Sequence, residues 1–400
     1  MFFQKNWDGN ERRMNNIQFE FATAGRIIFG IGSIQEIGKI ASKYGNRALV
    51  VTREDNSSPE PLFTLLKENN VYRIPFPIAG EPSVDKVLSG VSLAQAEKCD
   101  LVIGFGGGSV IDTGKAIAAM LTNAGDLYDY LEVIGKGKQL TNRSAPFIAI
   151  PTTSGTGSEV TKNAVISSPE HHVKVSLRSV LILPLLAIID PELTLTCPPE
   201  TTAYSGMDAL TQLIEPYTSV KMNPMMDGLC REGIRRVARS LQTAYNDGMN
   251  IEARQDMSIA SLFGGLALAN AGLGAVHGFS GVLGGMFPIP HGALCARLLP
   301  IVMDKNIQAL LERDPNNSAL CRYKEIAQIV TGNSDARIEE GFFWIRKIQM
   351  DLNIPSLAKF GVTRYDFAAI AEQARLSSSM KGNIISLTDT ELLDILEKSL

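Results

Sequence analysis

The chain has 400 residues, of which 45% are hydrophobic and 20% are charged, and glycine and proline are spread along its length. This length exceeds what one hydrophobic core usually serves, so we expect two domains around a shared cleft and the composition of a globular α/β protein, without extensive disorder. The formal net charge of −4, together with the lack of a run of basic residues, excludes a surface that tracks the phosphates of nucleic acid.

The N-terminal segment combines two phenylalanines with polar and charged residues. It lacks the apolar centre of a signal peptide and the length of a membrane span, so we expect a disordered tail over residues 1–15, no membrane partner and a cytoplasmic protein. The five cysteines are an odd number and show no CxxC spacing. Neither a disulfide framework nor a thiolate zinc site is indicated, which fits a reducing compartment.

Short apolar runs alternate with amphipathic segments in the first half of the chain. Strands are predicted at 47–52, 71–74, 100–105 and 147–150, and helices near 59–69, 83–98 and 109–122. Because the strands are almost continuously apolar, they predict a parallel sheet covered by helices on both faces. We therefore expect a Rossmann-like α/β domain over 16–195, with its ligand beyond the carboxyl ends of the strands.

The strongest local motif is a predicted strand that runs into three glycines, at 106–108, and then into a helix. Glycine lets a ligand approach the backbone, and the first turn of the helix offers free N–H groups to phosphate. Ser109 can add a hydroxyl and Lys115 a charge, while Asp112 can seat the loop or a nearby hydroxyl. The segment matches neither GxGxxG nor the Walker pattern, since Ala116 replaces the required hydroxyl, and an ordinary strand-to-helix turn stays open as the alternative.

A second loop of small and hydroxyl-bearing residues, PTTSGTGSE at 151–159, follows the predicted strand at 147–150. We expect it at the same edge of the sheet, where the two loops together can cover a dinucleotide. A hydroxyl-rich turn that caps a helix or strand at Ser158 is the alternative.

Helical patterns dominate from about residue 199, which predicts an all-α domain over 196–400. Two prolines separate His277 from His291, so each histidine is expected at the end of its own helix beside a cleft. Upstream, Asp208 and Gln212 lie four residues apart on one helical face. Asp208 and the two histidines form a ligand set that suits Fe(II) or zinc, although histidines hydrogen-bonded within the core would show the same spacing.

The other two histidines, His171 and His172, lie in a polar turn and are not expected to bind metal.

From about Phe19 onward the chain resembles the iron-containing (group III) alcohol dehydrogenases. The matching segments, in order, are GFGGGSVIDTGKAIA (104–118), PTTSGTGSEVT (151–161), DPELT (190–194), GMDALTQLIE (206–215), HGFSGVLGG (277–285) and PHGALCARLLPIVM (290–303). The resemblance implies a two-domain dehydroquinate-synthase-like fold, with a nicotinamide dinucleotide on the α/β domain and a divalent metal in the helical one. It also implies at least a homodimer.

The resemblance assigns roles residue by residue. The pyrophosphate would be held by Gly106, Gly107, Gly108 and Ser109, the adenine and ribose region would be lined by Thr152 and Thr153, and a ribose hydroxyl would be reached by Lys174. Three of the family's four metal positions fall on Asp208, His277 and His291, and the fourth on Gln212.

This sequence departs from the family pattern at three positions. Gln212 stands where most members carry a histidine, and its amide oxygen is a weak, uncharged ligand. Gly281 replaces a further histidine that many members place near the nicotinamide. Arg53 replaces an aspartate that would bind the adenosine ribose, which favours NADP slightly over NAD, although Glu54 and Asp55 follow it and a solvated arginine would look the same.

The expected function is that of an NAD(P)-dependent alcohol dehydrogenase or aldehyde reductase. Hydride would pass between the nicotinamide and a small alcohol or carbonyl compound polarised by Fe(II) or zinc, and the sequence offers no dedicated base. One alternative is a metal-independent reductase of keto acids, like the maleylacetate reductases, with Lys162 or Arg178 holding the carboxylate. A second is a dinucleotide-binding scaffold without catalysis.

Overall fold

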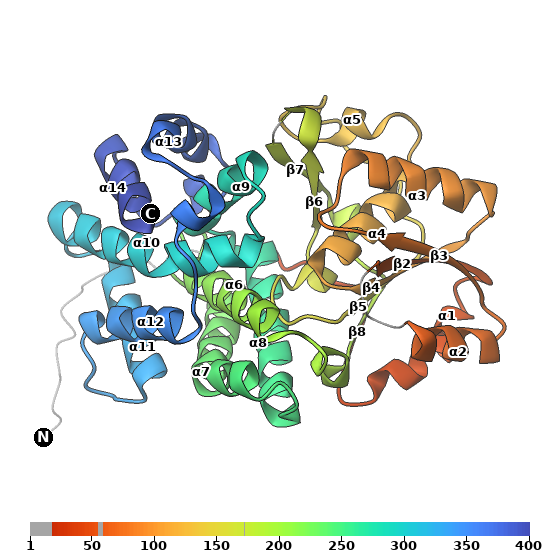
Figure 1. Cartoon of the computed structure of the whole chain (residues 1–400), viewed down its shortest axis with the longest axis horizontal. Helices are drawn as coiled ribbons and strands as arrows, with labels where there is room; N and C mark the ends of the chain where they lie inside the picture. The colour runs from red at the N-terminus through yellow and green to blue at the C-terminus, as the bar shows by residue number, and fades with distance from the viewer. Residues whose placement is uncertain (1–17, 55–58, 172) are drawn as a thin grey trace, which may run out of the picture.

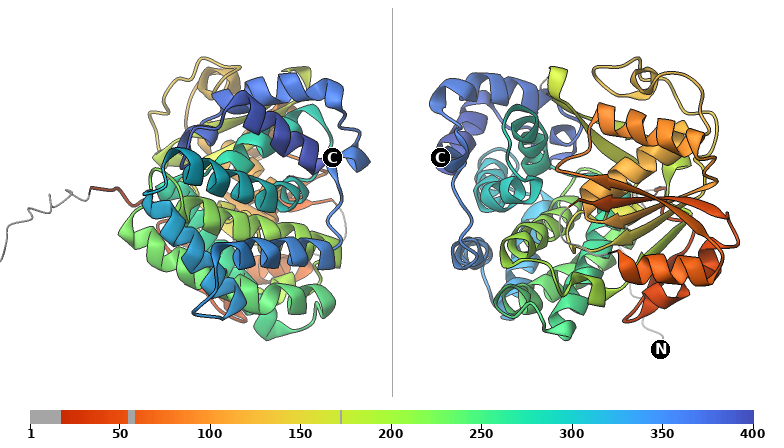
Figure 2. Two further views of the ribbon diagram at one scale, coloured as in Figure 1. Left: turned by 90° about the vertical axis from the view of Figure 1, so that its left-hand side faces the viewer. Right: turned by 45° about the vertical axis from the view of Figure 1, so that its right-hand side comes forward.

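The computed structural model describes residues 18–54, 59–171 and 173–400. The expected tail at 1–15, and with it Asp55 and His172, lies outside the described residues. Figure 1 shows an α/β half and a helical half side by side, as the sequence predicts, and Figure 2 shows the same arrangement from two other sides.

A six-stranded parallel sheet forms the centre of the α/β half. Its order is β1-β8-β5-β4-β2-β3. The four predicted strands are confirmed; β1 and β8 were not predicted, and neither was the antiparallel pair formed by β6 and β7. The bounds are β1 Ile27–Phe29, β2 Arg47–Arg53, β3 Tyr72–Ile78, β4 Leu101–Gly106, β5 Phe147–Pro151, β6 Asn163–Ser168, β7 Val173–Arg178 and β8 Leu186–Ile189.

Helices cover both faces of this sheet (Figure 1). On one face α1 (Ile37–Ala41) and α2 (Glu60–Glu68) pack on alternate residues of β2 and β4, and on the other α3 (Val84–Ala96) and α4 (Gly108–Met120) pack on the remaining ones. The short α5 (Leu127–Tyr130) follows α4. Burial on both faces explains why the strands are apolar throughout rather than alternating.

The chain leaves β2 and β4 toward opposite faces and opposite edges of the sheet. From β2 it passes through α2 to β3 at one edge, and from β4 through α4 to β5 on the other side. Adjacent parallel strands with diverging connections create a crevice at their carboxyl ends, where ligands bind in open α/β sheets. The glycine loop after β4 lies at this crevice, next to Arg53 at the end of β2.

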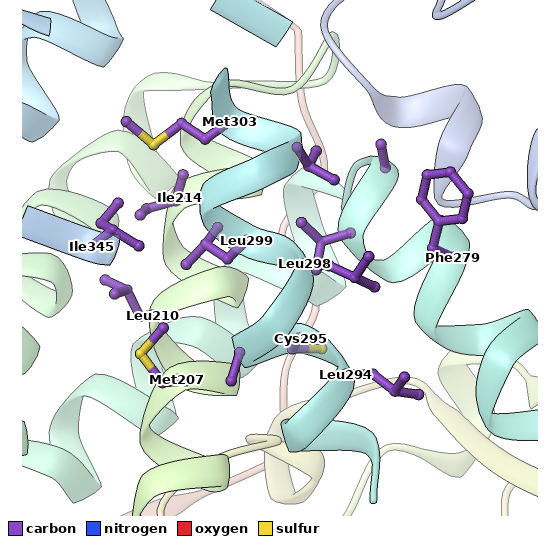
Figure 3. Close-up of a cluster of buried hydrophobic side chains, with 14 of the residues drawn as sticks. Met207, Leu210, Ile214, Phe279, Leu294, Cys295, Leu298, Leu299, Met303 and Ile345 are labelled. Carbon is purple, nitrogen blue, oxygen red and sulfur yellow. The ribbon is translucent and has the colours of Figure 1, made fainter. Parts of the chain in front are cut away.

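The helical half is built around α10. Its helices are α6 (Pro199–Tyr217), α7 (Pro224–Asn246), α8 (Ile251–Ala271), α9 (Ala275–Met286), α10 (His291–Arg313), α11 (Ser318–Thr331), α12 (Ile338–Asp351), α13 (Phe367–Leu376) and α14 (Asp389–Ser399). Figure 3 shows apolar side chains of α6, α9, α10 and α12 meeting in one core. A smaller apolar cluster, which includes Ala187, Ile189, Leu262 and Leu266, joins β8 to α8 and thus the two halves.

Local sequence sets where the site-bearing helices begin. Pro199 opens α6 and Pro290 directly precedes α10, so His291 is the first residue of α10. Gly272, with φ 69°, ends α8, and the chain turns by 98° into α9, whose first turn carries His277. The prediction that each histidine lies at the end of its own helix is confirmed.

Within the described residues, no single helix is both long and apolar enough to cross a membrane. Among these residues only α8 and α9 together reach that length and apolarity, and they are bent by 98° relative to each other.

Candidate active site

The two glycine-rich loops lie against each other at the carboxyl ends of β4 and β5, which are neighbours in the sheet. A Cβ on Gly108 would lie 2.8 Å from the side chain of Thr156, and one on Gly107 would lie 3.2 Å from Thr153 Oγ1. Helix α4 begins at Gly108, so its first N–H groups open toward this edge. These glycines are therefore needed for close contact between the two loops.

Lys115 and Asp112 hold the loops together from within. The Lys115 ammonium is fully buried and donates to Ser158 O and Thr161 Oγ1, both at 2.9 Å, and to Asn163 O. Asp112 accepts from Ser158 Oγ and pairs with Lys115 at 3.0 Å. Asp112 therefore holds the loop in place, which is one of the two roles predicted for it. The prediction that Lys115 brings charge to a phosphate is wrong, because its three donors are directed to protein acceptors inside the fold.

The second loop is wedged against the helical half. A Cβ on Gly157, which has φ 58°, would lie 2.5 Å from Gly265 Cα in α8, and one on Gly155 would lie 2.7 Å from Ser205 Cβ in α6. The Ser154 and Ser258 hydroxyls hydrogen-bond at 3.0 Å. The loop that borders the crevice thus also contacts α8 and α6, and α6 is the helix that carries Asp208.

Of the other predicted cofactor residues, Thr152 and Arg53 border the same crevice, and Lys174 lies on β7. Thr152 N donates to Gly106 O at 3.1 Å, which ties the start of the second loop to the end of β4. Arg53 ends β2 and is exposed. Lys174 of β7 lies 3.5 Å from Glu81 and 3.1 Å from where a Cβ on Gly284 of α9 would lie, so its ammonium reaches across from one half to the other.

Asp208, His277 and His291 converge from three helices, as the sequence predicts for a metal site. Asp208 Oδ1 lies 3.4 Å from His277 Nε2 and 3.7 Å from His291 Nε2. Asp208 and His277 are buried, whereas the His291 side chain is 34% exposed and forms the open side of the cluster. Cys295 joins them, since one ligand atom from each of the four residues lies within 4.8 Å of the others.

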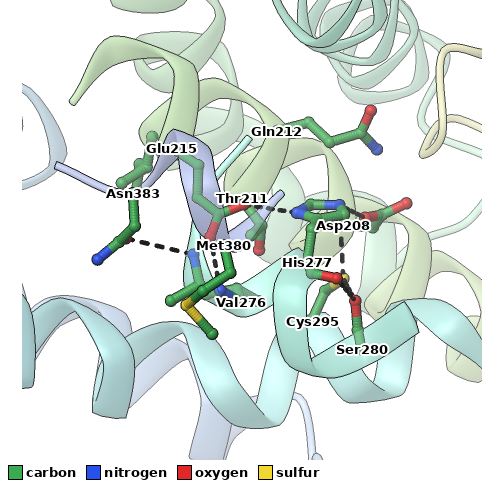
Figure 4. A network of polar contacts seen from close by, with 12 residues as sticks. Asp208, Thr211, Gln212, Glu215, Val276, His277, Ser280, Cys295, Met380 and Asn383 are labelled. Atoms are coloured by element: carbon green, nitrogen blue, oxygen red, sulfur yellow. Dashed lines mark hydrogen bonds and ion pairs between the residues drawn. The ribbon is translucent and has the colours of Figure 1, made fainter. Parts of the chain in front are cut away.

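Glu215, one turn beyond Gln212 on α6, orients His277 (Figure 4). One oxygen of Glu215 lies 2.6 Å from His277 Nδ1, and the other accepts from Val276 N at 2.7 Å. A carboxylate on Nδ1 fixes the tautomer that leaves Nε2 with a lone pair. With a cation in the cluster, the imidazole would therefore present the Nε2 lone pair to that cation.

These residues fit a divalent cation. Asp208 Oδ1 is buried and has no hydrogen-bond partner among the described residues, so a ligand in the cluster would satisfy it. Burial alone would raise the pKa of Asp208, yet the neighbouring His291 and His277 bring it below its ordinary value. Burial likewise acts to raise the pKa of Cys295, and the same two histidines reverse that effect. Anionic donors are thus favoured where a cation would bind.

Gln212 also lies beside this cluster but makes a different contact. Its Nε2 donates to Gly155 O in the second loop at 3.2 Å, while its Oε1 is buried without a partner among the described residues.

Sequence reasoning missed Glu215 and Cys295. The signals were present, because Glu215 lies seven residues after Asp208 and Cys295 four after His291, spacings that place each pair on one helical face. Arg178, named for the metal-independent alternative, is the last residue of β7, and its guanidinium pairs with Glu132 at 3.0 Å.

Comparison with known proteins agrees with this geometry. The family model described as iron-containing alcohol dehydrogenase matches residues 24–191, and the model of the C-terminal part of the Fe-containing alcohol dehydrogenase family matches 202–400. The 1,3-propanediol dehydrogenase of Klebsiella pneumoniae is 35% identical over 385 residues, which cover 92% of this chain and 97% of that protein.

Two solved structures are similar throughout. The crystal structure of a 1,3-propanediol oxidoreductase has a TM-score of 0.89 and 32% identity, and covers 96% of this chain and 100% of that one. The sulfoacetaldehyde reductase of Bifidobacterium kashiwanohense, solved in complex with NAD+, has a TM-score of 0.84 and 27% identity, and covers 96% and 99%. The chain belongs to the iron-containing alcohol dehydrogenase family and is an oxidoreductase acting on CH–OH groups, with a nicotinamide cofactor and a metal.

Proposed function

We propose that the protein reduces small aldehydes, and oxidises the corresponding alcohols, by hydride transfer to and from NADP(H), with Fe(II) or zinc bound at Asp208, His277 and His291. The observation that carries the proposal is the buried, unpartnered Asp208 Oδ1 facing two imidazoles. When bound there, a divalent ion supplies a Lewis acid for the substrate oxygen. Homodimers and a cytoplasmic location complete the proposal.

The residues of the chain position the reactants. The amides of the first turn of α4 hold the pyrophosphate, and the second loop, which touches both α4 and α8, sets the cofactor relative to the helical half. Substrate approaches from the side of His291, the exposed member of the cluster. A Cβ on Gly281 would meet nothing within 4 Å, so there is room for the proton to leave through water rather than through an imidazole at that position.

The lean toward NADP depends on Arg53. This residue ends β2 at the crevice, where an arginine can pair with a 2′-phosphate. Measuring kcat/KM with NADPH and with NADH tests the preference, and Arg53→Asp should shift the ratio toward NADH. A wild-type preference for NADH, unchanged in the variant, would leave the dehydrogenase assignment standing and remove NADP from the proposal.

Reconstitution tests the metal-assisted reaction. Protein stripped of metal is loaded with Fe(II) or zinc while NADPH and NADH oxidation is followed on short aldehydes. We expect turnover to depend on the added ion. Turnover that never responds to metal would favour a metal-independent reductase. The buried Asp208 Oδ1 without a hydrogen-bond partner argues against that alternative. If no carbonyl compound is reduced under any condition, the result would support the alternative of a dinucleotide-binding scaffold without catalysis.

A further inference from the structure

We propose that Cys295 is the fourth protein ligand of the metal site, a role that Gln212 does not fill, and that the site therefore prefers zinc to Fe(II). The inference rests on the metal-binding part of the function proposed above. It differs from that proposal in naming the donor that completes the site and the ion which that donor selects.

Cys295 points its sulfur at the metal-binding residues. It lies four residues after His291 on α10, so both side chains leave the same helical face. The Sγ atom is 3.6 Å from His291 Nε2 and 3.8 Å from His277 Nε2. Although Cys295 is fully buried and belongs to the apolar core shown in Figure 3, Figure 4 shows its sulfur beside His277 and Ser280.

The distances between donor atoms fit a tetrahedron. Zinc bonds of about 2.0–2.3 Å to oxygen, nitrogen and sulfur give tetrahedral edges of about 3.3–3.8 Å. The edges from Asp208 Oδ1 to the two imidazole nitrogens are 3.4 and 3.7 Å, and those from Cys295 Sγ are 3.6 and 3.8 Å. Four of the six edges thus agree with one ion at the centre.

Gln212 is the rival donor, since its Oε1 also lacks a partner among the described residues. Its amide is held by the bond from Nε2 to Gly155 O, and a Cβ on Gly264 of α8 would lie 3.2 Å from the Gln212 Cβ. In Figure 4 the amide lies beyond Asp208, on the far side of the cluster from Cys295. An uncharged amide oxygen is a weak ligand for zinc, whereas a thiolate is a strong one. Gln212 therefore links the metal site to the second loop.

The sulfur decides which ion is preferred. Ligation removes the thiol proton, which passes to water or buffer, and gives the site a soft anion beside one carboxylate and two neutral imidazoles. Soft donors favour zinc over Fe(II), and the general order of divalent affinities points the same way. Catalytic zinc sites can expand to five ligands, so four protein donors leave the exposed side at His291 open to substrate.

Cobalt substitution tests the inference without relying on activity. Metal-stripped wild type and variants are titrated with Co(II) under anaerobic conditions, and the near-ultraviolet thiolate-to-cobalt charge-transfer band is recorded. We expect this band in wild type, in Gln212→Ala and in the matched control Cys321→Ser, which alters an exposed thiol on α11. Cys295→Ser should lose the band and bind zinc on the order of tenfold or more weakly, with a smaller effect on Fe(II).

X-ray absorption of zinc-loaded wild type provides a second measurement that needs no variant. One sulfur scatterer at about 2.3 Å supports the inference, and a shell of oxygen and nitrogen alone contradicts it. Stoichiometric cobalt binding without the charge-transfer band, or a band that persists in Cys295→Ser, would overturn the role of Cys295 while leaving the metal-assisted reaction intact. Failure to bind any divalent ion would overturn both.

Discussion

The two halves of the molecule build their parts of the site in different ways. In the α/β half, backbone groups and glycines from two short segments form the site, and each segment directly follows a buried strand. In the helical half, side chains from α6, α9 and α10 meet although more than sixty residues separate Asp208 from His277. Backbone sites depend on steric room, whereas side-chain sites depend on charge and orientation. Substitutions should therefore act through different quantities in the two halves.

The largest effect is expected in the helical half, at Asp208. Asp208→Asn removes the buried charge that faces two imidazoles, so kcat/KM should fall by about 1000-fold, or about 4 kcal/mol in transition-state stabilisation. Steady-state kinetics and metal analysis measure it. The control is Asp304→Asn, which changes a carboxylate on α10 that accepts a side-chain hydrogen bond from Gln308. Full activity in Asp208→Asn would show that the site in the helical half does not depend on this charge.

The next effect concerns Glu159 in the second loop, between the two halves. Burial raises the pKa of Glu159 to about 7, with the Lys115 charge acting in the opposite direction. The native state thus holds a proton that the unfolded state releases, and the free energy of unfolding should fall as pH rises from about 4.5 to about 7, by at most about 3 kcal/mol. Glu159→Gln should lack this fall and be the more stable protein at pH 8.

Urea unfolding at several pH values measures this difference. The two proteins should have similar stability near pH 4.5, where both side chains are neutral, and diverge above it. Parallel curves over the whole range would show that Glu159 ionises as freely in the folded protein as in the unfolded one.

The third prediction concerns Glu215, which holds the His277 imidazole in place without being one of the proposed ligands. Glu215→Gln keeps the shape of the side chain but weakens its hold on His277 Nδ1, so metal affinity should fall by roughly 10- to 100-fold. Competition with a chelator gives the dissociation constants. Glu252→Gln, which alters an exposed residue on α8, is the matched control. Equal metal affinities in wild type and both variants would mean that the Glu215 carboxylate does not orient the His277 imidazole.

The smallest effect is expected in the α/β half, where the mechanism is steric. A Cβ on Gly108 would lie 2.8 Å from Thr156, and overpacking of this kind costs about 1–3 kcal/mol. Gly108→Ala should displace the loops and weaken NADPH binding by about tenfold. Fluorescence titration checks this, with Gly228→Ala as control, since a Cβ there meets nothing within 4 Å. Thr156→Ala in the same chain should restore much of the loss, and no recovery would point to a cause other than this contact.

The layered sheet, the glycine loop and three members of the metal cluster could be predicted before the structure was known. The strands β2, β4 and β5 are continuously apolar because both faces are buried, and this pattern is local. The first and last strands, β1 and β8, have only 3 and 4 residues, too few for a pattern to stand out. Asp208, His277 and His291 could be named because they fall on metal positions of the family that the chain resembles, and because carboxylate and imidazole suit a divalent ion.

Packing in three dimensions sets the roles of Lys115, Cys295 and Gln212. Lys115 follows the glycine loop, where a charge suggests phosphate, but the hairpin strand β6 and the second loop surround its ammonium with acceptors. Cys295 looks like one more small apolar residue of α10 until α6 and α9 bring two ligands to its sulfur. Roles such as these depend on which residues distant in sequence become neighbours, and that is fixed by packing rather than by local pattern.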